Sequence, residues 1–409
     1  MGRGAYGGYL FQWTVPLCGS AQRWFGGRTD PQYRRGAGNH RTGHPGHTGT
    51  RRSGRPGGPA DLPRHARSDY GCCPCDDGGG ENPRRDQGGG PAGRVVRLRE
   101  RLRPGSALDR DDIQQLRFGG ITLKNGRCNL QIIDAHQHLW DTAELSYPWL
   151  EGFDALRQRY GPKDYRTAFE GIDITRSVHI EADPAPGVEV AEVDRLVRIA
   201  AEDGMIGAIV ATAPLESEER EETLERLAGD YPLVVGVRRM AWHHEDPAFY
   251  SSPSLIEGVK ALPKYGYTFE LCANVTQLDA SVTLVRATPE VTHAINHCGG
   301  PDIAADGYAP WADYMNQLAG FPNTVCKISG LVTRAKENWT ADDLRPYIDH
   351  LIDIFGFDRV MYGSDWPVCT LAATFRAWFE TLVDAVKGVS EEDRRKLFHD
   401  NARRFYRLG

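Results

Sequence analysis

Two histidines separated by one residue, His136 and His138, stand at the end of an apolar run that begins at Ile132. Side chains two positions apart in a strand point to the same face, so both imidazoles would leave the strand end side by side. This arrangement suits two ligands of one metal ion, or two donors to one substrate oxygen. The simpler interpretation is a polar strand end whose two histidines are incidental.

Other polar residues follow other short apolar runs in the same way. They are His179 and Glu181, Arg238 and Arg239, His297, Lys327 and Asp365. Each alone is weak evidence, because turns and hydrogen-bonded strand ends use the same residue types. Their recurrence at the ends of successive runs predicts that they share one rim of the fold.

The elements that must position these residues are apolar runs alternating with amphipathic stretches. The runs cover residues 130–135, 175–180, 206–211, 233–238, 268–271, 292–296, 324–328 and 359–362. Helix-like stretches between them include 189–203, 217–230, 255–265, 277–287, 341–355 and 371–386. This alternation predicts an α/β fold, a single (β/α)8 TIM barrel over residues 119–409, with a doubly wound sheet as the alternative. In such a barrel the active site lies at the carboxyl ends of the strands.

Residues 1–118 differ in composition from the rest of the chain. Gly, Arg and Pro dominate there, no lysine occurs before Lys124, and no isoleucine occurs before Ile113. A segment with so few apolar residues cannot bury enough surface to offset the conformational entropy lost on ordering. This composition predicts a disordered segment. The same composition is also compatible with an artefact of start-site or frame assignment, or with a basic arm that binds nucleic acid.

The formal net charge is −6 at pH 7, and the arginine excess of residues 1–118 leaves the remainder more acidic than that. The negative charge of residues 119–409 disfavours a nucleic-acid partner. No run of the sequence is long and apolar enough for a membrane span. The cysteines after residue 118 are isolated and odd in number, which is typical of reduced cytoplasmic thiols. We therefore expect a cytoplasmic protein with a small-molecule substrate, and a homo-oligomer remains open.

Four segments occur in strand order: Asp-Ala-His-Gln-His-Leu-Trp at 134–140, His-Cys-Gly-Gly-Pro-Asp at 297–302, Cys-Lys-Ile-Ser-Gly-Leu at 326–331 and Met-Tyr-Gly-Ser-Asp-Trp-Pro at 361–367. Together they resemble the amidohydrolase superfamily. More narrowly, they resemble its lactonase group, which acts on sugar lactones, sulfomuconolactone and pyrone dicarboxylate. The resemblance covers residues 130–408.

The resemblance implies a metal-ligand set of His136, His138, His297 and Asp365. Two-metal members of the superfamily also carry a bridging Lys or carboxylate on strand four and a His on strand five. This chain offers arginines on strand four and no histidine on strand five. We therefore expect one divalent ion, with Zn²⁺ favoured, or none.

These residues lead us to expect a hydrolase that opens a sugar-acid or aromatic-catabolism lactone by water attack on the ester carbonyl. Asp365 would be the general base with His297 beside it, and His136, His138 or a bound ion would polarise the carbonyl. The candidates for substrate binding are Arg238, Arg239, His179, Glu181, Trp311 and Lys327. Only one of the adjacent arginines can face the lumen. The alternatives are a non-oxidative decarboxylase of the same superfamily and a non-catalytic barrel.

Overall fold

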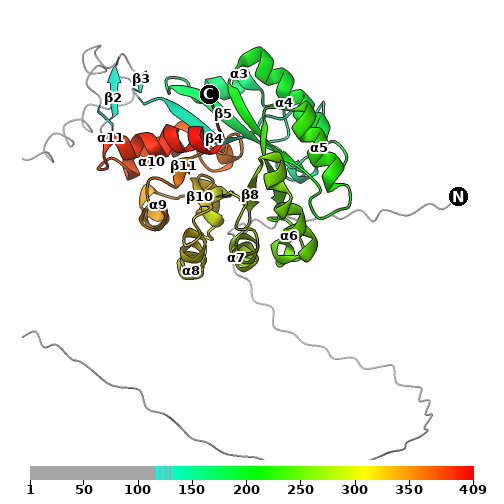
Figure 1. Ribbon diagram of the computed structural model, residues 1–409. Coiled ribbons are helices and arrows are strands. Elements are labelled where there is room, and N and C mark those ends of the chain that lie inside the picture. The colour runs from blue at the N-terminus through cyan, green and yellow to red at the C-terminus, as the bar shows by residue number, and fades with distance from the viewer. Residues whose placement is uncertain (1–116, 119–120, 125–126, 129) are drawn as a thin grey trace, which may run out of the picture. The chain divides into compact units, whose positions relative to one another are not determined.

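Eight parallel strands form one sheet that curves into a nearly closed barrel with helices around it (Figure 1). The computed structural model describes residues 117–118, 121–124, 127–128 and 130–409. Each strand pairs in parallel with the next along the chain: β4 (Ile132–Gln137), β5 (Ile174–Ile180), β6 (Ile206–Thr212), β7 (Val234–Met240), β8 (Thr268–Cys272), β9 (His293–Ile295), β10 (Thr324–Ile328) and β11 (Val360–Tyr362). The predicted (β/α)8 barrel is confirmed, and every expected strand overlaps an observed one.

The segment that precedes the barrel contains three short strands in a separate antiparallel sheet. They are β1 (Arg117–Phe118), β2 (Ile121–Lys124) and β3 (Arg127–Cys128). The expectation of disorder over residues 1–118 falls outside the described residues, apart from 117–118.

The connections between the barrel strands are mostly helical. The α-helices are α3 (Pro162–Ala168), α4 (Glu189–Asp203), α5 (Arg220–Asp230), α6 (Pro253–Lys260), α7 (Leu278–Ala287), α8 (Tyr308–Ala319), α9 (Ala341–Phe355), α10 (Phe375–Ala385), α11 (Glu391–Arg395) and α12 (Asn401–Phe405). Short helical turns of the 3-10 type are η1 (Pro148–Leu150), η2 (Phe249–Ser251), η3 (Leu262–Tyr265), η4 (Val275–Gln277), η5 (Asn296–Gly299), η6 (Val332–Arg334) and η7 (Val368–Leu371), and a π-turn, η8 (Lys396–Asp400), precedes α12. Among the described residues, no helix has the length and apolarity needed to cross a membrane.

The helix α4 illustrates why these stretches form helices where they do. Val193, Leu196 and Ala200 recur at intervals of three and four residues and are buried against the sheet. The helix ends at Gly204, which adopts a left-handed φ of 72° that glycine tolerates without strain. At the other side of the barrel, α9 begins after Thr340, whose capping box with Asp343 satisfies the first backbone amides.

Two apolar layers hold the barrel together. The larger one lies between the strands and the helices and includes Ile209 of β6 and Leu224 of α5. The smaller one fills the lumen with strand residues such as Val178 and Val210, and with Tyr406 and Leu408 from the C-terminal segment. Asn401 holds that segment in place because its side-chain amide donates to the carbonyls of Phe357 and Val360 at the amino end of β11. The C-terminal segment therefore closes the amino end of the barrel and leaves the carboxyl end for the site.

The barrel closes between its first and last strands through residues just beyond β11. The amide of Asp365 donates to the carbonyl of His136, and the amide of His138 donates to the carbonyl of Trp366, both at 2.8 Å. The closure therefore runs through the residues that the sequence predicts as functional.

Candidate active site and metal-binding residues

The end of β4 carries a local irregularity that turns His136 toward the lumen. Asp134 pairs with Ser177 and Gln137 pairs with His179, so three steps along β4 lie opposite two steps along β5. Such a bulge inserts one extra residue and shifts the alternation of side chains. Asp134 consequently faces outward to Tyr165, whereas His136 and His138 both face Asp365.

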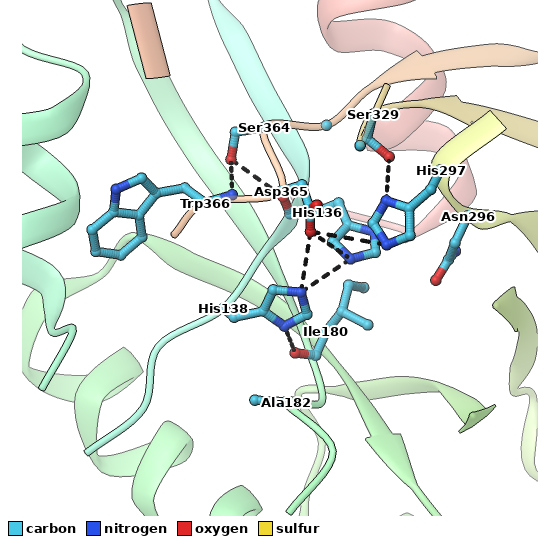
Figure 2. A network of polar contacts seen from close by, with 12 residues as sticks. His136, His138, Ile180, Ala182, Asn296, His297, Ser329, Ser364, Asp365 and Trp366 are labelled. Atoms are coloured by element: carbon cyan, nitrogen blue, oxygen red, sulfur yellow. Dashed lines mark hydrogen bonds and ion pairs between the residues drawn. The ribbon is translucent and has the colours of Figure 1, made fainter. Parts of the chain in front are cut away.

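Four candidate ligand atoms converge at the carboxyl end of the barrel (Figure 2). Oδ1 of Asp365 lies 3.5 Å from Nε2 of His138, 3.8 Å from Nε2 of His136 and 3.9 Å from Nε2 of His297. The Nε2 atoms of His136 and His138 are 3.2 Å apart. The structure therefore brings together all four residues that the sequence predicts as the ligand set.

The opposite ring nitrogens of two histidines are held by the surrounding strands. Nδ1 of His138 donates to the carbonyl oxygen of Ile180 at 2.8 Å, so Nε2 of a neutral His138 presents a lone pair to the cluster. Nδ1 of His297 lies 3.1 Å from Oγ of Ser329. These contacts orient both rings, as the outer hydrogen bonds of metal-ligating histidines do.

The backbone around His297 is adapted to its position. His297 has a φ of 48°, in the left-handed region that non-glycine residues rarely adopt. Gly330 lies directly against its ring, and a Cβ atom at Gly330 would lie 2.6 Å from Nδ1 of His297. Glycine at this position is thus a steric requirement of the site.

The electrostatics of the cluster favour neutral imidazoles around an ionised carboxylate. Burial lowers the pKa of His297 to about 4, and burial lowers the pKa of His136 well below its usual range. Burial acts to raise the pKa of Asp365, but His297 and His138 oppose it and hold that pKa below its ordinary value. Neutral imidazole and ionised carboxylate are the protonation states that bind a divalent metal ion.

The spacing of these atoms fits a divalent ion. Ligands at about 2.0–2.1 Å from a tetrahedral Zn²⁺ lie about 3.3 Å from one another. Nε2 of His136 lies 3.2 Å from Nε2 of His138, and the three imidazole nitrogens lie 3.5–3.9 Å from Oδ1 of Asp365. His136, His297 and Asp365 form a group whose ligand atoms all lie within 4.8 Å of one another. The part of the chain that the structure describes contains no second group of this kind.

Two buried ion pairs line the lumen beside the cluster. Arg238 donates through Nε to the carboxylate of Glu181 at 2.5 Å, and Lys327 Nζ lies 2.7 Å from Oε2 of Glu270. Asn296 connects the pairs, because its side chain accepts from Arg238 at 3.4 Å and donates to Glu270. All four charged side chains are buried, so each charge is compensated within the protein.

Three other predicted residues lie apart from the ligand cluster. Arg239 points away from the lumen and pairs with Glu216, which makes Arg238 the inward member of the adjacent arginines. Trp311 is buried in α8 and donates from its indole nitrogen to the carbonyl of Cys298 at 2.7 Å. His179 is fully buried, with its ring centroid 6.1 Å from that of His138, and neither of its nitrogens has a hydrogen-bond partner among the described residues.

The carboxylate of Asp134 lies in the first motif, yet the sequence pattern indicates no role for it. It accepts hydrogen bonds from the amides of His136 at 3.1 Å and Ser364 at 2.8 Å, and from the hydroxyl of Tyr165 at 2.6 Å. The pattern indicates no role for Trp242 and Arg334 either, which follow β7 and β10. Their position after strand ends was the available signal, but loop residues of these types are common at any surface.

Comparison with known proteins adds independent information. A protein-family model described as Amidohydrolase matches residues 133–408 of the chain. L-fucono-1,5-lactonase of Burkholderia ambifaria is 30% identical over 283 residues, which cover 68% of this chain and 95% of that protein.

Solved structures resemble the barrel as well. An amidohydrolase from Burkholderia multivorans with bound zinc superposes with a TM-score of 0.62 at 28% identity, covering 68% of this chain and all of that one. A probable 2-pyrone-4,6-dicarboxylic acid hydrolase from Acinetobacter baumannii, at 13% identity and a TM-score of 0.57, covers 68% of this chain and 99% of its own and shares the fold.

Proposed function

Because the chain belongs to the amidohydrolase family, we propose that it hydrolyses the ring ester of a lactone, with Asp365 as the general base. The observation that carries the proposal is the ionised Asp365 carboxylate, which lies 3.5–3.9 Å from three imidazole nitrogens at the carboxyl end of the barrel. The similarity to a protein named as an L-fucono-1,5-lactonase supports the same reaction.

The residues of the cluster can divide the steps of lactone hydrolysis among them. Asp365 accepts a proton from water while the water oxygen bonds to the carbonyl carbon. As the ring carbon–oxygen bond breaks, Asp365 returns that proton to the leaving ring oxygen, and the product is a hydroxy acid. The lone pair that Nε2 of His138 presents cannot stabilise the negative charge that develops on the carbonyl oxygen, so a bound cation would supply that stabilisation.

A single divalent ion fits the same residues, with Zn²⁺ favoured by the donor set of imidazole and carboxylate. His136, His138, His297 and Asp365 would hold it, and a bound ion would supply Lewis-acid polarisation of the carbonyl. The zinc in the structurally similar amidohydrolase of Burkholderia multivorans supports this assignment.

The proposal is tested by assaying the purified protein against aldonolactones, a muconolactone and a pyrone dicarboxylate, with release of the ring-opened acid as the readout. Parallel assays after treatment with a chelator examine the role of a metal ion. We expect hydrolysis of at least one lactone class. Loss of CO₂ from hydroxybenzoates without any lactone hydrolysis would contradict the proposal and favour a decarboxylase.

A further inference from the structure

We propose that Trp242 and Arg334 form the wall of the active site that binds the ring of an uncharged, polyhydroxylated lactone. The inference rests on the proposed lactone hydrolysis and specifies its substrate class.

Both residues lie on segments that follow the carboxyl ends of barrel strands. Trp242 follows β7, and Arg334 is the last residue of η6, which follows β10. The indole ring of Trp242 meets the ring of His297 edge-on, with centroids 6.4 Å apart at 85°. The guanidinium carbon of Arg334 lies 5.0 Å from the indole centroid. Both side chains are only partly buried, and the guanidinium of Arg334 lies over the indole ring beside His297.

The position of the indole is fixed by the backbone around it. A Cβ atom at Gly300 would lie 2.8 Å from Cζ3 of Trp242, so the ring packs directly on that glycine, which has a φ of 60°. The side-chain amide of Asn274 donates to the carbonyl of Trp242 at 3.3 Å. A ring held in this way loses little entropy when a ligand binds against it.

Arg334 keeps donors available for a ligand. Its Nε donates to the carbonyl of Pro301 at 3.3 Å, whereas its two terminal nitrogens donate to no protein group among the described residues. No carboxylate of the described residues lies within 4.0 Å of its guanidinium nitrogens. Arg238 and Lys327 differ in this respect, because each is bound to a buried glutamate.

The charges around the site disfavour a lactone that carries two carboxylates because, of Arg238, Lys327 and Arg334, only Arg334 has no carboxylate partner among the described residues. A lactone with two carboxylates needs cationic partners for both once they leave water, and Glu181 and Glu270 already compensate the lumenal cations. Asp365 adds a further negative charge near the reacting carbonyl. A guanidinium can instead donate to ring hydroxyls, while the indole covers the C–H face of the same ring.

The test compares Trp242→Leu and Arg334→Gln with the parent protein in steady-state hydrolysis of an uncharged aldonolactone. We expect KM to rise about tenfold in each variant, the factor that one lost hydrogen bond or aromatic contact contributes to binding, while kcat changes less than threefold. Arg345→Gln is the control for Arg334, because its guanidinium pairs with Asp349 along the outer helix α9. Trp339→Leu controls for the loss of an indole at the same end of the barrel, since its ring nitrogen donates to the carbonyl of Ala372. Thermal unfolding of every variant separates a loss of binding from a loss of folded protein.

Substrate preference gives the second readout. The parent is expected to have a higher kcat/KM for aldonolactones than for a pyrone dicarboxylate. Lactone hydrolysis by the parent with the opposite preference would overturn this inference, and so would an unchanged KM in both variants. Either result would leave the proposed function standing. A parent that hydrolyses no lactone at all would overturn both.

Discussion

The backbone amide of Asp365 donates a hydrogen bond to the carbonyl of His136 at 2.8 Å, where the last strand segment of the barrel meets the first. The proposed base and a candidate ligand are therefore joined through the main chain as well as through their side chains, whose Oδ1 and Nε2 atoms are 3.8 Å apart. The geometry of the site consequently depends on the closure of the barrel.

The hydroxyl of Tyr165 is predicted to support this closure through Asp134. Tyr165→Phe removes one of the three donors to the buried Asp134 carboxylate, the other two being the amides of His136 and Ser364. We expect a loss of about 1–3 kcal/mol in the free energy of unfolding and a fall of about tenfold in kcat, because the ligands shift. Denaturant unfolding and steady-state kinetics measure both quantities.

Tyr231→Phe is the matched control, since Tyr231 donates to Asp194 at 2.7 Å between α5 and α4, far along the chain from the site residues. It should lower stability without changing kcat. Equal losses of kcat in the two variants would refute a specific role for the Tyr165 contact.

Gly330→Ala is predicted to inactivate the protein by displacing His297. The added Cβ would lie 2.6 Å from Nδ1 of that ring. Gly266→Ala provides the control, because Gly266 has a similar φ, 70° against 66°, in the left-handed region, with nothing within 4 Å of the new methyl group. Both variants should lose about 1–2 kcal/mol of stability from backbone strain, but only Gly330→Ala should lose lactone hydrolysis. An active Gly330→Ala variant would show that the position of His297 is not critical.

The positions of site residues could be predicted from the sequence where they depend on neighbouring residues of the same strand, and not where they depend on contacts between distant segments. Strand alternation correctly placed His136 and His138 together, and it limited the inward arginine to one of Arg238 and Arg239. It could not anticipate the bulge at the end of β4, because an inserted residue is specified by pairing with β5 rather than by the run itself. The contact of Asp134 with Tyr165 was equally hidden, since it joins a strand to a helix that follows an irregular stretch.

For the same reason, the sequence could not predict the contact between the loop residues Trp242 and Arg334. Trp242 and Arg334 belong to different loops, and the 5.0 Å between the Arg334 guanidinium carbon and the Trp242 indole centroid is a consequence of the barrel's geometry. Sequence patterns define strands and helices by periodicity, but loops that follow them have none.

The stability of the protein should depend on pH through Glu192. Burial, together with the charge of Glu181, raises the pKa of Glu192 from 4.5 to about 8 in the folded protein. Between those values the folded state holds a proton that the unfolded chain has released. The contribution of Glu192 to the free energy of unfolding therefore falls as pH rises from about 5 to 8. Glu192→Gln should remove this pH dependence. The free energy of unfolding of the variant minus that of the parent should therefore increase by on the order of 4 kcal/mol as pH rises from about 5 to 8.

Denaturant unfolding at a series of pH values measures this difference. Glu202→Gln, at an exposed position of the same helix α4, is the control and should leave the pH dependence of the parent unchanged. A constant difference between Glu192→Gln and the parent across the range would contradict the prediction.

Metal content tests the ligand set without relying on turnover. We expect elemental analysis of the purified protein to find at most one divalent ion per chain, and the content to fall in His136→Ala and His297→Ala. The chain offers a single group of three converging metal ligands among its described residues. A value close to two equivalents that varies with activity would mean that further ligands exist.

The most direct test of the account is the rate of lactone hydrolysis by Asp365→Asn, measured beside the parent on the same substrate and at the same metal content. The substitution keeps the size of the side chain and the backbone bond to His136 but removes the carboxylate that accepts the proton. We predict a rate lower by about 10²–10⁴-fold with an unchanged circular dichroism spectrum. A folded variant within about threefold of the parent rate would exclude Asp365 as the base and contradict the proposed mechanism.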